Sequence, residues 1–367
     1  MQNGLLKQGD TIALFLPTFT PYIEIAHLER FQFKIVAINA SSVRADGTHD
    51  WHYPASEIAK LENPKIKLAV TVNPSNPPSV AFSPVEMKQI VGLIRKNPDL
   101  VLVTDDVYGT FVPNFRSLMA EVPHNTICVY SFSKNFGCTG WRLGVIATHE
   151  KNTMDRRIAE LPASWKNRLN KRYGAMTMEP EKLKFIDRMV ADSRNVALNH
   201  TAGLSLPQQV QMGFFALSHL LDLKDAYKHL TMQIVRARRD ALWRGLGVPL
   251  PPEDPMRGWY YVELDFMVWA KNTYGDAFCK YMTSNYEPVD FLFRLAEKSG
   301  VVLMDGGGFG GVGSINHGPL ASTGNVYCLS ADGTPQVLAT ANQPYGPRIS
   351  PDGTLIAFQV VVGEGLS

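Results

Sequence analysis

Short apolar runs of strand length recur through the first 150 residues of the chain. Most are continuously apolar rather than alternating, which is typical of strands covered on both faces of a sheet. Helical patterns lie between several of them, such as Pro84–Arg95, which has Glu86 in its first turn. Strands that alternate with helices predict an α/β domain with a mainly parallel sheet. The predicted strands are Thr11–Leu16, Phe33–Asn39, Ile66–Val72, Leu100–Asp105, Thr126–Phe132 and Arg142–Thr148.

Beyond about Lys151 the pattern changes to long helical periodicity, with apolar residues at three- and four-residue spacing. A strand at Trp259–Asp265, a helix at Val289–Lys298 and a strand at Val301–Met304 then predict a smaller α+β lobe. The long predicted helices are Glu181–Asp192, Pro207–Leu221 and Lys224–Leu246.

The last part of the chain loses helical periodicity and is rich in turns. Gly346–Phe358 resembles the strand–turn–strand unit of a β-propeller blade, although a propeller needs several full blades. The predicted strands here are Asn325–Leu329, Gln336–Thr340 and Leu355–Val362. We therefore expect three parts: residues 1–205, residues 206–311 and a foreign β-rich tail at residues 312–367.

Composition narrows the class of protein. Hydrophobic residues make up 45% of the 367 residues, charged residues 19%, and the net charge is +2, which gives no field to attract nucleic acid. No run approaches the roughly 18 apolar residues of a membrane span, and no secretion signal is evident. The four cysteines, Cys128, Cys138, Cys279 and Cys328, lack metal-ligand spacing and are expected to be free thiols. We expect a cytoplasmic protein without a metal, nucleic-acid or membrane partner.

Four polar motifs follow predicted strands in a fixed order: Pro17–Phe19, Asn73–Ser79, Thr104–Tyr108 and Ser131–Arg142. Ligands of open α/β sheets bind outside the carboxyl ends of the strands. The four motifs are therefore expected to line one crevice. Gly137 and Gly140 in the last motif suit a tight loop that approaches a phosphate.

This ordered set resembles the fold-type I aminotransferases, which use pyridoxal 5'-phosphate (PLP). The resemblance is closer to the bifunctional aspartate aminotransferase/aspartate 4-decarboxylase family and covers roughly residues 1–310. It implies a mainly parallel central sheet flanked by helices, with a smaller incomplete lobe. It also implies conversion of L-aspartate to L-alanine and CO2, slower transamination with a 2-oxo acid, and a homo-oligomer. The stretches that carry this resemblance are Thr139–His149, Glu181–Ser205, Pro207–Met212 and Asp290–Leu303.

The resemblance implies a role for each motif residue. Lys134 matches the lysine that holds PLP as a Schiff base and later acts as a general base, and Tyr108 is the second residue expected to be catalytic. A carboxylate must pair with the pyridine nitrogen so that the ring can accept electrons. The residues that match cofactor contacts are Asp105 for the ring nitrogen, Asn76 and Tyr108 for the ring oxide, Ser131, Ser133 and Arg142 for the phosphate, and Phe19 for the ring face.

Each residue also has a plainer interpretation when taken singly. Phe19 suits a hydrophobic core, Asn76 a turn, and Asp105 with Tyr108 an ordinary strand end. The spacing Ser-x-Ser-Lys to Gly-x-x-Gly-Trp-Arg favours a cofactor site over coincidence. A general class I/II aminotransferase and an inactive remnant that keeps only partial PLP affinity remain as alternatives.

The sequence departs from the family pattern in two places. The family has a further segment before the Phe19 motif, with a glycine-rich turn that binds the phosphate, whereas this sequence starts almost at that motif. After Gly307–Gly311 the family carries an arginine for the substrate α-carboxylate. His317 falls at that position here and fits a loop residue better, because a neutral histidine cannot replace a bidentate guanidinium. We expect a truncated, fused chain with weak or absent activity.

Overall fold

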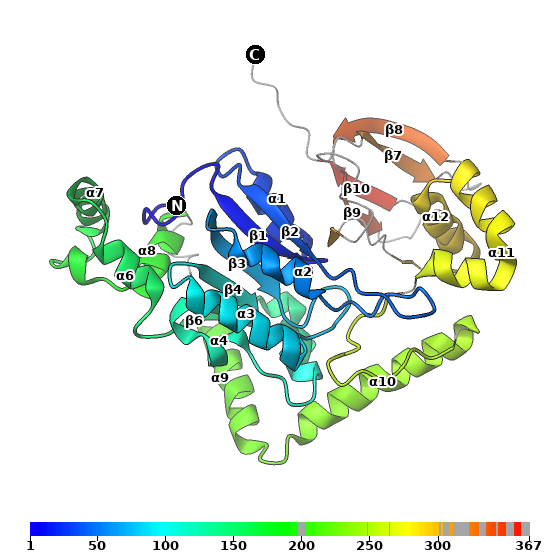
Figure 1. Ribbon diagram of the computed structural model, residues 1–367, viewed down its shortest axis with the longest axis horizontal. Coiled ribbons are helices and arrows are strands. Elements are labelled where there is room, and N and C mark those ends of the chain that lie inside the picture. The colour runs from blue at the N-terminus through cyan, green and yellow to red at the C-terminus, as the bar shows by residue number, and fades with distance from the viewer. Residues whose placement is uncertain are drawn as a thin grey trace. The chain divides into compact units, whose positions relative to one another are not determined.

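The computed structural model describes residues 1–196, 203–247, 249–263, 265–300, 302–303 and 309–310, and four further strands between residues 323 and 360. The chain divides into two compact units. The first comprises Met1–Cys279 with Gly308–Val312, and the second comprises Lys280–Gly307 with Gly313–Ser367. Figure 1 shows the elements of both units.

The first unit contains a six-stranded sheet in the order β2-β1-β3-β4-β5-β6. Neighbouring strands are parallel, except that β6 runs antiparallel to β5. The sheet confirms the predicted α/β fold, and each strand lies within two residues of its predicted bounds. The strands are β1 (Thr11–Leu16), β2 (Lys34–Asn39), β3 (Ile66–Val72), β4 (Val101–Asp105), β5 (Thr126–Ser131) and β6 (Gly144–Thr148).

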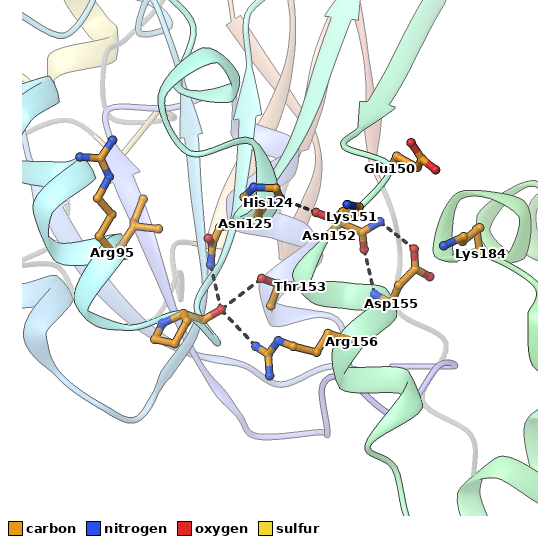
Figure 2. A pocket seen from close by; sticks show the side chains of 12 residues that line it. Arg95, His124, Asn125, Glu150, Lys151, Asn152, Thr153, Asp155, Arg156 and Lys184 are labelled. Atoms are coloured by element: carbon orange, nitrogen blue, oxygen red, sulfur yellow. Dashed lines mark hydrogen bonds between the residues drawn. The ribbon is translucent and has the colours of Figure 1, made fainter.

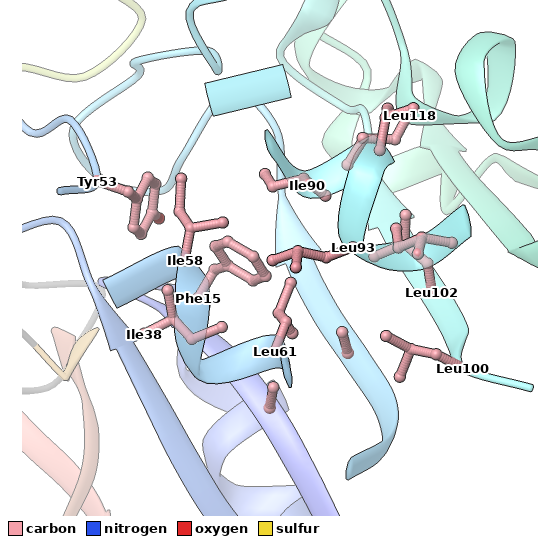
Figure 3. Packing of buried hydrophobic residues seen from close by; sticks show 14 of the residues in the cluster. Phe15, Ile38, Tyr53, Ile58, Leu61, Ile90, Leu93, Leu100, Leu102 and Leu118 are labelled. Carbon is pink, nitrogen blue, oxygen red and sulfur yellow. The ribbon is translucent and has the colours of Figure 1, made fainter. Parts of the chain in front are cut away.

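Strand β1 shows why the continuous apolar pattern predicts a strand covered on both faces. Ala13 and Phe15 point into one cluster, shown in Figure 3, which contains Ile58 and Leu93 from the helices over that face. Ile12, Leu14 and Leu16 point into a second cluster on the other face, with Ala26 of helix α1. Because successive side chains of a strand alternate between faces, a strand with two cores needs apolar residues at every position.

The expectation that a strand is covered on both faces of the sheet is wrong for β6. Its residues Gly144–Ala147 are exposed, with Val145 and Ile146 41% and 46% accessible. The strand is the edge of the sheet, beyond β5, so only one neighbouring strand shields it.

Helix α3 illustrates how the local sequence sets a boundary. Ser83 caps its first turn, Glu86 completes a capping box and Pro84 occupies the first helical position. The predicted helices at Pro84, Glu181, Pro207, Lys224 and Val289 are confirmed with shifted ends. The helices are α1 (Thr20–His27), α2 (Ala55–Ile58), α3 (Pro84–Lys96), α4 (Leu118–Glu121), α5 (Phe132–Asn135), α6 (Thr153–Ala159), α7 (Ala163–Tyr173), α8 (Phe185–Val196), α9 (Leu206–Leu221), α10 (Ala226–Leu246), α11 (Phe266–Asn285) and α12 (Pro288–Ser299).

The predicted strand at Trp259–Asp265 is wrong over the described residues, which have no regular structure before α11 begins. Trp259 has a φ of 57°, outside the strand region, and the amides of Gly258 and Tyr261 bond to Ser79 instead of to a strand. The apolar residues there therefore do not mark a strand. Val301 and Met304, the ends of the next predicted strand, lie outside the described residues.

The second unit contains two antiparallel strand pairs, β7 (Thr323–Leu329) with β8 (Pro335–Asn342), and β9 (Pro344–Ile349) with β10 (Ile356–Val360). The two strands expected within Gly346–Phe358 are confirmed by the second pair, and the residues between them lie outside the described residues. His317 lies outside the described residues.

Candidate active site

The predicted site residues come from neighbouring strands at the carboxyl edge of the sheet. Val72 at the end of β3 pairs with Asp105 at the end of β4, and Asp105 pairs with Val129 of β5. The segments that follow these strands carry Asn76, Tyr108 and Lys134, so parallel pairing alone brings three segments of distant sequence to one edge.

Lys134 lies in the short helix α5, directly after β5. The hydroxyl of Ser131 accepts a hydrogen bond from the Ser133 amide at 3.2 Å and so caps this helix. Helices α9 and α10 hold α5 from outside: Phe215 stacks on Phe136 with ring centres 4.1 Å apart, and Tyr227 donates to the Asn135 carbonyl at 2.8 Å. The Lys134 amine donates to the hydroxyl of Tyr261 at 3.3 Å.

Asp105 is a largely buried carboxylate at the end of β4. Its Oδ2 accepts from the Tyr22 hydroxyl at 2.9 Å and its Oδ1 accepts from the Val107 amide at 3.2 Å. Burial raises the pKa of this carboxyl above its usual value, against the effect of both hydrogen bonds. Within the described ranges, Asp105 has no ion pair, so its negative charge has only neutral donors around it.

Asp106 points to a different environment from its neighbour. Its Oδ1 accepts from Thr104 at 2.6 Å and its Oδ2 lies 3.4 Å from the Cys128 thiol. Successive side chains at the end of a strand project to opposite faces, which separates two adjacent aspartates that look equivalent in the sequence. Only Asp105 reaches Tyr22.

Asn76 and Tyr108 form a buried pair beside Asp105. The Asn76 amide nitrogen donates to the Tyr108 hydroxyl at 3.4 Å, and Tyr108 is only 2% exposed. Burial raises the pKa of Tyr108, and the neighbouring phenol of Tyr261 raises it further. The Oδ1 atom of Asn76 is buried and has no partner among the described residues. Buried amide oxygens are normally hydrogen-bonded, so this atom marks a site with unused polar capacity.

The residues predicted to contact the phosphate and the ring face make fewer contacts with the rest of the candidate site. Ser133 is buried beside Lys134, whereas Arg142 is exposed, with a left-handed backbone (φ 54°), and donates to the Thr139 carbonyl at 3.0 Å. The Ser131 hydroxyl also donates to the Leu143 carbonyl at 3.2 Å. Phe19 is 45% exposed, and its ring meets Tyr22 edge-on with centres 6.0 Å apart. A phosphate role for Arg142 and the serines, and a stacking role for Phe19, stay predictions.

Sequence reasoning missed Tyr22, Ser79 and the pair Tyr260–Tyr261. Tyr22 follows the Phe19 motif by three residues, and Ser79 closes the Asn76 motif, so both were within reach of a motif-based search. The tyrosine pair lies 127 residues from Lys134, and only its run of aromatic residues after Gly258 marks it in the sequence.

A cavity of about 580 Å³ lies elsewhere, near the amino ends of β5 and α6 (Figure 2). Its polar lining is largely bonded to itself: Thr153 and Arg156 both donate to the Pro98 carbonyl, and Asn152 pairs with Asp155. None of the predicted site residues lines it. The chemistry of its lining gives no reason to place the active site there.

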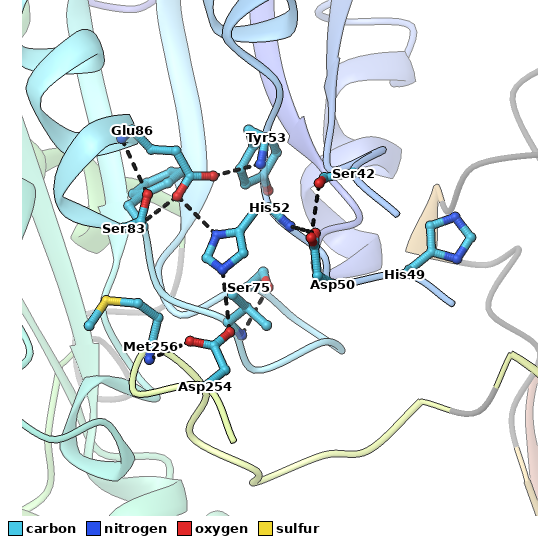
Figure 4. A network of polar contacts seen from close by, with 12 residues as sticks. Ser42, His49, Asp50, His52, Tyr53, Ser75, Ser83, Glu86, Asp254 and Met256 are labelled. Carbon is cyan, nitrogen blue, oxygen red and sulfur yellow. Dashed lines mark hydrogen bonds and ion pairs between the residues drawn. The ribbon is translucent and has the colours of Figure 1, made fainter. Parts of the chain in front are cut away.

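A polar network around His52 links helix α3 to Asp254, which lies seven residues before Tyr261 in the sequence (Figure 4). His52 Nδ1 lies 3.0 Å from Glu86, and its Nε2 lies 3.3 Å from Asp254. Burial disfavours the charged imidazole, but the carboxylates of Asp254 and Glu86 outweigh it and raise the pKa of His52 to about 10. Among the residues that the structure describes, no group of His, Cys, Asp and Glu side chains is arranged to hold a metal ion.

Lys134, Asp105 and the Asn76–Tyr108 pair all follow strands at the carboxyl edge of an α/β sheet, which is the edge where enzymes of this fold class bind their cofactors. The sequence profile of the family "Aminotransferase class I and II" matches residues 3–203. The chain therefore belongs to the class I and II aminotransferase family.

Relatives and solved structures agree with this assignment. The chain is 47% identical, over 309 residues, to the bifunctional aspartate aminotransferase and L-aspartate beta-decarboxylase of Pseudomonas sp.. This match covers 84% of this chain and 57% of the relative. It is 28% identical to an aspartate aminotransferase of Sulfurisphaera tokodaii over 43% of this chain and 39% of that one. The fold is similar to an aspartate aminotransferase of Thermotoga maritima, with a TM-score of 0.51, 19% identity, and coverage of 84% and 64% of the two chains.

The chain thus spans 57% of the length of its bifunctional relative and 39% of the aspartate aminotransferase. In the described part of the chain, no helix has both the length and the apolar character that a membrane crossing requires.

Proposed function

We propose that this chain binds PLP through Lys134 and acts on L-aspartate, releasing the β-carboxylate as CO2 and leaving L-alanine, with transamination to a 2-oxo acid as a side reaction. The observation that carries the proposal is the partly buried carboxylate of Asp105, which has no cationic partner among the described residues and lies near Tyr108, the partner of Asn76. When bound, PLP supplies an electron sink for the carbanion formed at the substrate.

The residues on this edge suit the polar groups of that cofactor. Asp105 would pair with a protonated ring nitrogen, and the added positive charge would offset the cost of burying the carboxylate. Asn76 and Tyr108 offer an amide and a phenol to the ring oxide. Arg142 would exchange its bond to the Thr139 carbonyl for the phosphate, beside Ser131 and Ser133, and Phe19 would cover the ring face.

Lys134 would also move protons once the substrate amine has displaced it. Its amine lies on a short capped helix that packing holds in place, so it can take a proton at Cα and return it nearby. The choice of aspartate as substrate rests on the name of the bifunctional relative and on 47% identity. Cytoplasmic location and a homo-oligomeric state belong to the same proposal and rest on the family resemblance alone.

A general class I/II aminotransferase is the second candidate, and the family match from residue 3 to residue 203 favours it as strongly as the first. The two differ in the product from aspartate. An enzyme with β-decarboxylase activity forms alanine and CO2 in equal amounts, whereas an aminotransferase forms oxaloacetate and needs a 2-oxo acid to turn over.

The test begins with the absorption spectrum of the purified chain after addition of PLP. We expect a visible band from bound PLP that is lost on borohydride reduction. Reduction leaves PLP attached to Lys134 irreversibly, which peptide mass spectrometry detects. Lys134→Ala is expected to lose the band entirely. A band that survives in Lys134→Ala, or a label on other lysines only, would contradict the proposal. Measuring CO2, alanine and oxaloacetate from aspartate then separates the two candidates.

A further inference from the structure

The segment that precedes α11 places two tyrosines over the Lys134 amine. The Lys134 Nζ lies 5.8 Å from the ring centres of both Tyr260 and Tyr261, but only the Tyr261 hydroxyl is within hydrogen-bonding distance, at 3.3 Å. The two rings meet edge-on with centres 4.9 Å apart. The amine therefore has two nearly equivalent aromatic neighbours and one hydroxyl acceptor.

Tyr261 is joined to the rest of the candidate site as well. Its ring meets the Tyr108 ring edge-on, with ring centres 5.6 Å apart. Tyr108 in turn accepts from Asn76. The Lys134–Tyr261 and Asn76–Tyr108 hydrogen bonds are thus joined by a contact between the two tyrosine rings.

The backbone around Tyr261 is fixed by the loop that carries Asn76. The Tyr261 amide donates to the Ser79 hydroxyl at 3.0 Å, and the Gly258 amide donates to the Ser79 carbonyl at 2.7 Å. Ser79 is fully buried and has a φ of 60°, a left-handed conformation that a serine adopts only when its surroundings impose it. Gly258 packs so closely that a Cβ there would lie 3.2 Å from Phe111.

We infer that Tyr261 is a positioning residue, which holds the Lys134 amine toward the group that it attacks and ties its position to the Asn76–Tyr108 pair. This inference rests on the proposed function, since the attacked group is the aldehyde of PLP. In that step Nζ forms a bond to the aldehyde carbon and gives up its two hydrogens, which leave with the aldehyde oxygen as water. A held amine reacts faster with a bound aldehyde because less orientational freedom is lost.

The test compares Tyr261→Phe with Tyr260→Phe. The second variant removes the hydroxyl from the other tyrosine, whose ring centre lies at the same 5.8 Å from the Lys134 amine. Two reactions of Lys134 are measured by peptide mass spectrometry. One is trapping of PLP by borohydride, and the other is methylation by formaldehyde and cyanoborohydride without PLP, normalised to other lysines. Thermal unfolding of both variants reports whether the fold is intact.

In Tyr261→Phe we expect PLP trapping to slow by about two- to tenfold, the range of one hydrogen bond. Methylation by the freely diffusing small aldehyde is expected to quicken over about the same range, because the amine is no longer held. Tyr260→Phe is expected to leave both rates within about twofold, below the range for one hydrogen bond. Equal rates in the two variants would overturn the inference. If the unmodified chain traps no PLP at Lys134, the proposed function fails, and the methylation arm still decides whether Tyr261 holds the amine.

Discussion

The candidate active site and the His52 network lie in the same unit but differ in how their charges are matched. In the network, the imidazole of His52 lies between two carboxylates, Glu86 and Asp254, each at hydrogen-bonding distance. In the site, the carboxylate of Asp105 has only neutral donors, and the Oδ1 atom of Asn76 has no partner among the described residues. Matched charges stabilise a fold, whereas unmatched buried groups cost stability and are expected where a ligand completes them.

The largest effect that this comparison predicts is on cofactor affinity at Asp105. In Asp105→Asn the charge is lost but the shape is kept, so PLP is expected to bind roughly ten- to hundredfold more weakly, as for a lost hydrogen bond between charged groups. Titration of the PLP absorption band measures this. Asp106→Asn is the matched control, because Asp106 bonds to Thr104 and Cys128. Equal weakening in both variants would mean that Asp105 has no special place in the site.

Breaking the network should act on stability instead. His52→Ala leaves the carboxylates of Glu86 and Asp254 without their shared partner, at a cost of about 1–3 kcal/mol in the free energy of unfolding. Urea unfolding followed by fluorescence measures this loss. Asp105→Asn is expected to change stability little or to raise it, because burial disfavours the charge that it removes. If Asp105→Asn were the more destabilising of the two, the distinction between a matched and an unmatched region would be wrong.

The network should also make stability depend on pH in the alkaline range. The pKa of His52 is raised from its ordinary 6.5 to about 10, so its contribution is complete below pH 6.5 and is lost as the pH rises toward 10. The melting temperature of the unmodified chain is expected to fall across this window more steeply than that of His52→Gln. Parallel curves for the two proteins would show that His52 is not the titrating group.

The smallest predicted effect concerns Phe19. Its ring is 45% exposed, so Phe19→Ala is expected to leave the melting temperature nearly unchanged. If the ring covers PLP, its removal should weaken PLP binding by about two- to tenfold, equivalent to roughly 0.5–1.5 kcal/mol for an aromatic contact. The same absorption titration measures this, with Phe31→Ala as a control at another ring, which stacks on Phe33. A large loss of stability would instead place Phe19 in the core.

Much of the fold could be predicted because the information was local. Continuous apolar runs defined the bounds of β1 and β3, and Glu86 in the first turn marked the helix that starts at Pro84. Prediction failed at Trp259, where the residues predicted as a strand belong to an irregular segment held by Ser79. The prediction of burial also failed for β6, because the residues of a strand do not indicate whether another element covers its outer face.

For the site, the sequence by itself determined the order of Asn76, Asp105, Tyr108 and Lys134 along the chain and their place after strands. Parallel pairing then leaves little freedom, because the carboxyl ends of neighbouring parallel strands meet at one edge. Only the tertiary structure decided that Tyr22 donates to Asp105 and that Tyr261 accepts from Lys134. These contacts join residues 83 and 127 positions apart, and they depend on how separate elements pack, which no local period of the sequence encodes.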